Sequence, residues 1–480
     1  MEGRIIAGIG TIADGILRTV EGVQSGVNEA LFEPVVRLGV TGLARSGKTV
    51  FITSLVANLL DRGRMKGLVA EAEGRILQTY LEPQPDHGVP RFDFEGHLDT
   101  LTGADPDWPE STRSISQLRL SIRLRGGGLL SGLTGPRTVH LDIVDYPGEW
   151  LLDLALLDLS FEEWSAKAFE MAAKPGHAHH AAAWLAATDG VDPGDDVGEP
   201  AAQALARAFT EYLARCREAG LSGLTPGRFL MPGDLEGSPA LTFAPLAKPE
   251  RARGSSLWRQ FEKRYESYKR IVVRPFFRDH FARIDRQVVL VDALSAIHAG
   301  PAAVEDLRAA LVDVLSAFRP GPNTWLSSIL GKRVERILFA ATKADHLHHA
   351  QHSRLVALMK AMVREASDRA AFRGAAVEAA AIASLRATVE QTITHDGRPL
   401  DVVRGRLLDT GKMAALHPGD LPEDPGRILS PARRGEEAWL DGDYSIMRFA
   451  PAGDPLSPGD GPPHIRLDRA IEFLIGDRLR

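Results

Sequence analysis

Residues 42–49 combine glycines, a lysine and hydroxyl side chains at a spacing that can hold phosphate groups. They read GLARSGKT and match the pattern G-x-x-x-x-G-K-[ST] in full. In such a loop the backbone N–H groups surround the phosphates, the lysine reaches the β- and γ-phosphates, and the last hydroxyl binds Mg²⁺. The motif predicts phosphate contacts from Gly42, Ala44, Arg45, Ser46, Gly47, Lys48, Thr49 and Val50, with Thr49 as a ligand of Mg²⁺.

A second motif, Asp-Tyr-Pro-Gly, starts at Asp145 and follows the apolar run 138–144. A carboxylate on a strand beside a phosphate loop holds the magnesium ion. The N–H of the motif's glycine can contact the γ-phosphate and so respond to its presence. We expect Asp145 as the second metal ligand and Gly148 as the γ-phosphate sensor, although an ordinary strand-to-turn ending has the same pattern when it stands alone.

A third motif indicates which base the site would take. Thr342-Lys343-Ala344-Asp345 follows an apolar run and resembles the [NT]-K-x-D signature of GTPases. The carboxylate of Asp345 would accept two hydrogen bonds from guanine, which adenine cannot offer, while Lys343 covers the base. The small-residue turn at Ser384 would complete the pocket. The alternative is that Asp345 only caps a following helix.

Four residues are candidates for hydrolysis, which requires charge neutralisation and a positioned water. Lys48 and Arg45 would neutralise charge, Glu149 would orient the water, and Thr112 would close over Mg²⁺ as a further ligand. Each of the last three has an alternative. Glu149 could form a structural ion pair, Arg45 could pair with another part of the protein or a partner, and Thr112 could face solvent.

Apolar runs predict the strands that position these motifs, and amphipathic patterns predict helices between several of them. Strand and helix in alternation favour an α/β fold: a P-loop NTPase (Ras-like GTPase) core with a mostly parallel sheet, a large helical insertion and a small C-terminal β-rich module. The expected strands are 35–42, 117–125, 138–145, 286–294, 334–342 and 375–384.

The wide spacing of the motifs indicates insertions into one core. We expect the stretch 83–109, rich in proline, to be irregular, and Asp396-Gly397 to form a turn in the β-rich module. The insertion is the expected contact for an unknown protein partner. The predicted units are an amphipathic segment (1–33), a first core part (34–149), the insertion (150–285), a second core part (286–384), the β-rich module (385–463) and a helix packing on the core (464–480).

Composition excludes several classes of protein. Of the 480 residues, 44% are hydrophobic and 25% are charged, which is typical of a globular chain, and the net charge of −6 disfavours nucleic acid as a partner. The single cysteine and the lack of a long apolar run or a secretory signal predict a cytoplasmic protein. Residues 1–30 carry an apolar helical stripe, which we expect to dock on the protein itself; peripheral contact with the cytoplasmic membrane is the alternative.

Two groups of histidines have metal-like spacing. Neither has cysteine partners, so we interpret both as solvated helix faces rather than metal sites. The first group is His177, His179 and His180, and the second is His346, His348, His349 and His352.

The chain as a whole resembles the YcjX family of bacterial P-loop GTPase-like proteins. The matching runs include TGLARSGKTVFITSLV, LDIVDYPGEWLLDL, ILFAATKADH and PHIRLDRAIEFLIGDRLR. The resemblance implies a GTPase-type fold, binding of GTP or GDP, and an association with envelope stress responses. The loop also looks like that of guanylate-binding-type large GTPases, which carry an arginine finger at the place of Arg45. We expect a slow, Mg²⁺-dependent GTP hydrolase acting as a switch; the alternatives are a nucleotide-binding scaffold with negligible turnover, or an ATPase.

Overall fold

The computed structural model describes most of the chain after the N-terminal segment. Residues 1–32 with their apolar stripe, Ala44 and Thr112 lie outside the described residues. The described ranges are 33–43, 45–110, 114–126, 135–317, 334–372, 374–439, 444–452 and 457–480.

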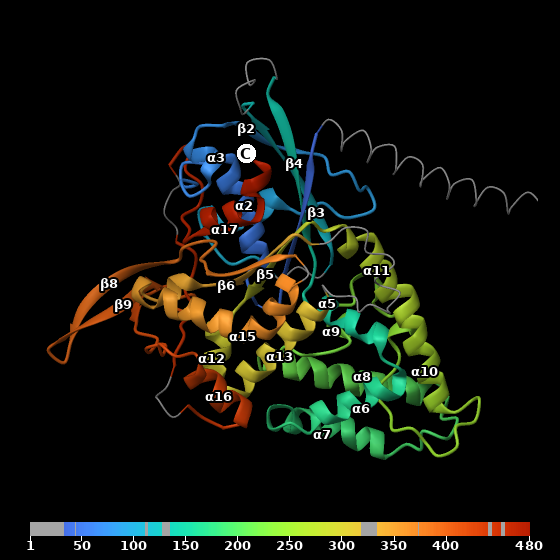
Figure 1. The fold of residues 1–480 in the computed structure, drawn as a ribbon. Helices are drawn as coiled ribbons and strands as arrows, with labels where there is room; N and C mark the ends of the chain where they lie inside the picture. The colour runs from blue at the N-terminus through green and yellow to red at the C-terminus, as the bar shows by residue number, and fades with distance from the viewer. Residues whose placement is uncertain are drawn as a thin grey trace, which may run out of the picture.

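A seven-stranded sheet forms the centre of the structure, in the order β2-β3-β4-β1-β5-β6-β7 (Figure 1). Strand β3 is antiparallel to both of its neighbours, and every other pair in the sheet is parallel. The mostly parallel α/β fold predicted from the sequence is thereby confirmed. The strands are β1 (Val35–Gly42), β2 (Ile76–Glu82), β3 (Ser116–Leu124), β4 (Arg137–Asp145), β5 (Arg286–Val291), β6 (Arg336–Ala341) and β7 (Ala376–Ala381).

The central strands are apolar because both of their faces are covered. In β5, Val288 and Leu290 pack into the core on one side of the sheet, whereas Val289 and Val291 pack into the core on the other side. Because β4, β1, β5, β6 and β7 pair in parallel, their carboxyl ends lie at one edge of the sheet. The predicted motifs follow these strand ends.

Among the described residues, four helices contribute to the buried cluster on one face of the sheet, including the short α3 (Val69–Ala72) through Ala70. The helix after the phosphate loop, α2 (Lys48–Leu60), packs there together with α4 (Phe94–Thr102) and the C-terminal helix α17 (Leu467–Ile475). Ile471 and Leu474 of α17 belong to the same buried cluster as β5 and β6. The C-terminal helix therefore packs on the sheet, and Figure 1 shows it beside α2.

The other face carries the helices that follow β5 and β6, the helix that follows β10, and the long helical region after Gly148. All of these helices share one continuous buried cluster with the sheet. The insertion is therefore part of the same hydrophobic core as the sheet and does not form a separate one. The helices are α12 (Ala293–Ala299), α13 (Pro301–Ala317), α15 (His352–Phe372) and α16 (Gly426–Arg434), and within the insertion α5 (Glu149–Leu152), α6 (Phe161–Ala172), α7 (Pro175–Asp189), α8 (Gly198–Glu218), α9 (Gly227–Leu230), α10 (Leu257–Tyr268) and α11 (Arg274–Asp279).

A second, antiparallel sheet of three strands follows β7, as the β-rich pattern predicts. Strands β8 (Thr388–His395) and β9 (Arg398–Arg406) form a hairpin whose turn is Asp396-Gly397, both with positive φ, and β10 (Met413–Leu416) pairs with β9. The same region also contains α16.

Among the elements that were not expected from the sequence are a strand and a helix of the first core part. Strand β2 is half exposed at the sheet edge, so its sequence ILQTYLE lacks an apolar run. The stretch interpreted as irregular contains α4, where the Asp93 side chain caps the helix by accepting from Gly96 N at 3.2 Å. Proline composition misled the interpretation because the prolines flank this helix.

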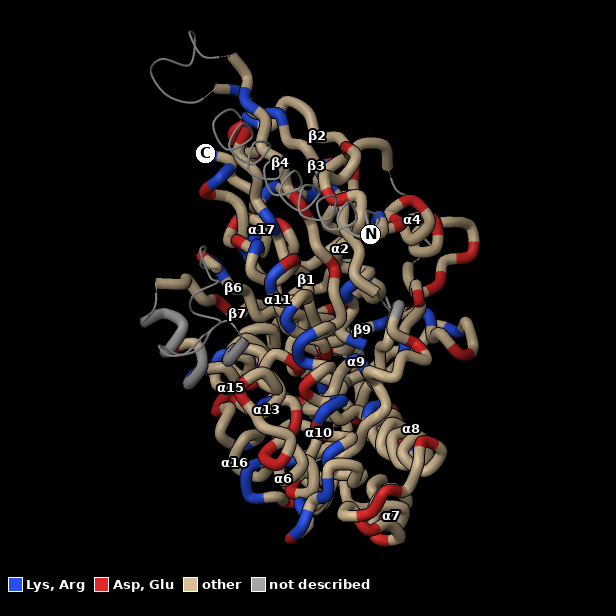
Figure 2. Tube along the Cα trace, turned by 90° about the vertical axis from the view of Figure 1, so that its right-hand side faces the viewer, with Lys and Arg blue, Asp and Glu red and all other residues tan. Residues whose placement is uncertain are grey.

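Charges of both signs are interspersed over most of the chain (Figure 2). Among the described residues, none of the helices is both long enough and apolar enough to cross a bilayer.

Candidate nucleotide-binding site

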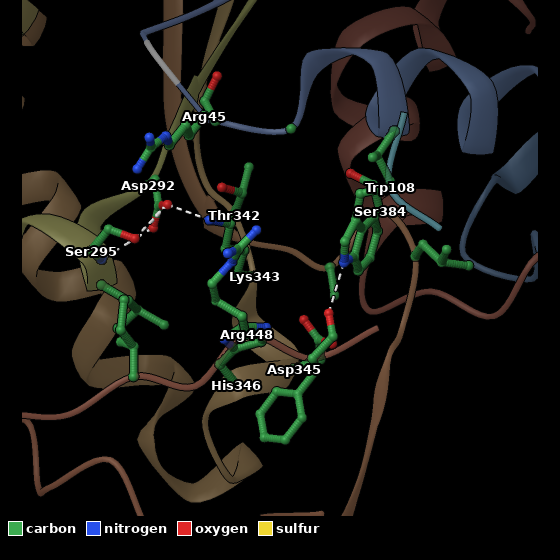
Figure 3. A pocket seen from close by; sticks show the side chains of 18 of the residues that line it. Arg45, Trp108, Asp292, Ser295, Thr342, Lys343, Asp345, His346, Ser384 and Arg448 are labelled. Carbon is green, nitrogen blue, oxygen red and sulfur yellow. Dashed lines mark hydrogen bonds and ion pairs between the residues drawn. The ribbon is translucent and has the colours of Figure 1, made fainter. Parts of the chain in front are cut away.

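A cavity of about 400 Å³ lies at the carboxyl edge of the parallel strands, where ligands bind in open α/β sheets. It brings together ten of the predicted site residues: Arg45, Ser46, Gly47, Lys48, Thr49, Val50, Thr342, Lys343, Asp345 and Ser384. Gly42, Asp145, Gly148 and Glu149 do not line it. Figure 3 draws Arg45 and Asp292 on one side of the cavity, with Trp108 and Ser384 on the other.

The phosphate loop turns sharply between β1 and α2. Gly47, with φ 81°, is the N-cap of α2, and Ser46 N donates to Leu43 O at 3.1 Å. A β-carbon on Gly42 would overlap the Ser46 hydroxyl, so only glycine fits there. The turn aims the N-terminus of a 13-residue helix at the cavity, and such an end attracts anions.

The Asp-x-x-Gly segment lies directly behind this loop. Asp145 is the last residue of β4 and pairs in register with Val40 of β1. It therefore lies on the strand next to the one that leads into the phosphate loop. Gly148 packs on the backbone of Gly42. Asp145 and Thr49 are both buried, at 1% and 6% exposure, and contribute a carboxylate and a hydroxyl.

At the far end of the cavity, Asp345 is held in place by the start of β8. Its Oδ2 accepts from Ala387 N at 2.8 Å, and the Thr388 hydroxyl donates to its backbone carbonyl. A carboxylate has about four acceptor positions, so this anchor leaves capacity for further donors. The neighbouring Lys343, with φ 58°, forms an ion pair with Asp292.

Sequence reasoning missed one wall of the cavity. Trp108 comes from the loop between α4 and β3, and its indole Nε1 donates to Phe449 O at 2.7 Å. Phe449 in turn contacts His346 edge to face, with ring centroids 5.3 Å apart. Burial lowers the pKa of His346, so this ring is neutral at pH 7. The sequence did contain one indication of this aromatic wall, a tryptophan in a proline-flanked loop. A large apolar ring in such a loop generally packs against another part of the protein.

The cavity carries an excess of positive charge. Its lining includes four basic residues and two acidic ones, and one acid is already paired with Lys343. An anionic ligand therefore fits the site electrostatically. The charged lining residues are Arg45, Lys48, Lys343, Arg448, Asp292 and Asp345.

Glu149 and Trp150 join the end of the Asp-x-x-Gly segment to the insertion. Glu149 is buried, and its Oε1 lies 3.8 Å from Nε of Arg217 in α8. The Arg228 guanidinium stacks on the Trp150 ring at 3.2 Å, and the indole donates to Met231 O at 3.2 Å. The residue after Gly148 is thus placed against the insertion and outside the cavity lining.

Some members of the two histidine groups are buried, although both groups were predicted to lie on solvated helix faces. His177 and His352 are both 2% exposed, so that interpretation is wrong for them. His352 Nε2 contacts the carbonyl of Ala344 at 2.8 Å, which makes it a structural support of the base end. Cys216 is buried next to His177, and burial raises its pKa to about 12, so its thiol is no nucleophile.

A phosphate-type loop between β1 and α2, at the carboxyl edge of this strand order, defines the fold as that of a P-loop NTPase. The sequence model of the YcjX-like family, DUF463, matches residues 36–479, and the chain belongs to this family. A relative from Escherichia coli K12 named "Ras-like GTPase YcjX" is 37% identical over 460 residues, covering 92% of this chain and 96% of the relative. A protein of the same name from Shewanella oneidensis MR-1 is 36% identical over 468 residues, covering 92% and 94%. The resemblance seen in the sequence is confirmed.

Proposed function

We propose that this protein binds and slowly hydrolyses GTP in the presence of Mg²⁺ and acts as a nucleotide-dependent switch. One observation carries the proposal: Lys48 of the phosphate loop and Asp345, 297 positions apart in sequence, line the same cavity. The relatives named as Ras-like GTPases support the same conclusion.

The phosphates would lie on the loop, with Lys48 and the N-terminus of α2 facing them. Thr49 and Asp145 fit as magnesium ligands because both contribute oxygen atoms, which Mg²⁺ prefers, from buried side chains, one at the end of the loop and one on the neighbouring strand. When bound, the ion neutralises charge on the phosphate oxygens. Thr112 stays a predicted third ligand.

The guanine would lie between Lys343 and the aromatic wall formed by Trp108. Asp345 would accept from the two guanine donors, and its anchor on Ala387 holds the carboxylate still for that purpose. Preorganisation of this kind lowers the entropy lost on binding. Ser384 lines the cavity beside this end and would contact the base.

For hydrolysis, we infer that Arg45 neutralises charge that develops on the γ-phosphate. It lies in the loop, lines the cavity and is exposed to it. Glu149 is the less favoured candidate for orienting water, because its carboxylate faces Arg217 of the insertion. In this position Glu149 would instead transmit a change in the position of Gly148 to helix α8, through its ion pair with Arg217.

The insertion would convert nucleotide state into a signal for a partner protein. Gly148 contacts the phosphate loop, and the next two residues contact α8 and the segment 228–231. A shift of Gly148 would therefore reach the insertion through packed side chains. The link to envelope stress stays a prediction from the family resemblance.

Competition binding tests the choice of base. Labelled GTP is bound to the full-length protein with Mg²⁺, and unlabelled GTP, ATP and XTP are added as competitors. We expect ATP to compete poorly. Asp345→Asn should weaken GTP binding about a hundredfold or more, since two charge-assisted hydrogen bonds are worth about 1.5–3 kcal/mol each. It should also improve XTP binding, because xanthine carries a carbonyl in place of the 2-amino group.

Asp396→Asn is the matched control, since Asp396 is exposed at the hairpin turn, far along β8 from Ala387. Equal competition by ATP and GTP would exclude guanine specificity and favour the ATPase alternative. Phosphate release over many turnovers separates a hydrolase from a nucleotide-binding scaffold, which would release no more than one phosphate per chain.

A further inference from the structure

Three side chains outside the nucleotide cavity converge between the base-end loop and the β8–β9 hairpin. They are His348 and His349, which follow Asp345 in the chain, and Glu390 of β8. One potential ligand atom from each lies within 4.8 Å of those of the other two. Among the described residues, this is the group of histidine, cysteine and carboxylate side chains that could hold a metal ion.

The distances fit a small metal ion. Glu390 Oε2 lies 2.6 Å from Nδ1 of His349 and 3.8 Å from Nε2 of His348. Tetrahedral zinc, with bonds of about 2.0–2.2 Å to nitrogen and oxygen, separates its ligand atoms by about 3.3 Å. Each of these two separations would therefore need to change by less than about 1 Å to match the spacing of zinc ligands.

A further carboxylate, that of Asp401, lies near the second ring nitrogen of His348. Asp401 Oδ2 lies 3.6 Å from Nδ1 of His348, on the side of the ring away from Glu390, and its Oδ1 accepts from the Thr392 hydroxyl at 2.8 Å. Metal-binding histidines generally donate their second N–H to such a carboxylate. In the structure the same Nδ1 also accepts weakly from Ala350 N at 3.4 Å, a contact that metal binding would replace.

We propose that His348, His349 and Glu390 bind one divalent transition-metal ion of the zinc type, with Asp401 orienting His348. Two imidazoles and one carboxylate suit Zn²⁺, whereas the oxygen-only pair Thr49 and Asp145 suits Mg²⁺. The two sites therefore differ in ion preference, and the inference does not depend on nucleotide binding.

The site ties the base-end loop to the second sheet. Glu390 lies two residues after Thr388, whose hydroxyl donates to the Asp345 backbone. His349 N also donates to Glu390 Oε1 at 3.1 Å. A bound ion would hold these two segments together and so stabilise the position of Asp345.

Zinc titration of the full-length, nucleotide-free and chelator-treated protein tests the site. We expect saturable binding of one Zn²⁺ per chain by calorimetry, and Co²⁺ in its place should give visible absorption bands of a nitrogen- and oxygen-ligated ion. Glu390→Gln and His349→Ala should abolish stoichiometric binding. Asp401→Asn should weaken it about 10–100-fold.

His395→Ala is the matched control, since His395 ends strand β8 of the same hairpin, is exposed, and has its Nε2 3.6 Å from Asp396 Oδ2 at the turn. It should bind Zn²⁺ as the wild type does, and so should Thr49→Ala, which separates this site from the phosphate loop. Circular dichroism checks that each variant is folded. Unchanged Zn²⁺ binding in folded Glu390→Gln and His349→Ala, or no saturable binding at micromolar Zn²⁺ in the wild type, would overturn the proposal.

Discussion

A β-carbon on Gly148 would lie 2.5 Å from the carbonyl oxygen of Gly42, so the glycine of the Asp-x-x-Gly segment packs on the first residue of the phosphate loop. This contact joins two residues that are 106 positions apart in the chain. It leaves no room for any side chain at Gly148. The backbone there is ordinary helical backbone, with φ −65°, so the constraint is steric and not conformational.

The first prediction concerns this contact. Gly148→Ala should lower the free energy of unfolding by about 1–3 kcal/mol, as other overpacked sites do, and should weaken GTP binding because the loop must shift. Urea unfolding and nucleotide titration measure the two effects. Gly254→Ala is the control, since a β-carbon there meets no atom within 4 Å. Equal free energies of unfolding for the two variants would show that the Gly148–Gly42 contact can accommodate a methyl group.

The second prediction concerns Arg45. Arg45→Ala should lower GTP turnover, by about 10³-fold or more if it acts as an internal arginine finger, while nucleotide affinity stays within a few-fold. Arg45 has φ 60°, a conformation that alanine tolerates poorly and glycine readily adopts. Arg45→Gly should therefore reproduce the loss of turnover if the guanidinium is responsible. Unchanged turnover in both variants would remove Arg45 from the mechanism.

The third prediction concerns the aromatic wall. If the base packs near Trp108, nucleotide binding should change the intrinsic fluorescence of the protein, and Trp108→Leu should remove most of that change. Stacking on an aromatic ring is worth about 1–3 kcal/mol per base, so GTP affinity should also fall at least several-fold. Trp439→Leu, at a tryptophan that donates to Ile297 O outside the cavity, should leave both signals in place.

The fourth prediction concerns a buried acid in the insertion. Burial raises the pKa of Asp153 from 3.8 to about 6, against the opposing effect of hydrogen bonds from Tyr268, Gly227 and Arg228. Between these values the folded protein binds more protons at Asp153 than the unfolded chain does. Stability contributed by this group therefore falls as pH rises from about 4 to 6, by an amount on the order of 3 kcal/mol.

Urea unfolding at several pH values measures this effect. The free energy of unfolding of the wild type, relative to Asp153→Asn, should decrease from pH 4 to 6 and then level off, since asparagine does not titrate. A difference that is independent of pH would show that folding does not raise the pKa of Asp153.

Much of the fold could be predicted from the chain because its signals are local. The core strands are apolar runs, the loop 42–49 is contiguous, and the turn at Asp396-Gly397 lies within three residues of its hairpin strands. Strand β2 and helix α4 escaped prediction because their stability comes from neighbours and a cap, and their own patterns are weak.

The candidate site divides in the same way. Residue types and spacing pointed to the phosphate loop, Asp145 and Asp345, because each motif is a short contiguous segment at a strand end; the roles of these residues in binding stay predictions. The aromatic wall around Trp108, the pairing of Glu149 with Arg217 and the group at His348, His349 and Glu390 are visible only in the folded chain. Each joins residues that are distant in sequence, and packing of whole elements sets their separation, which no local pattern records.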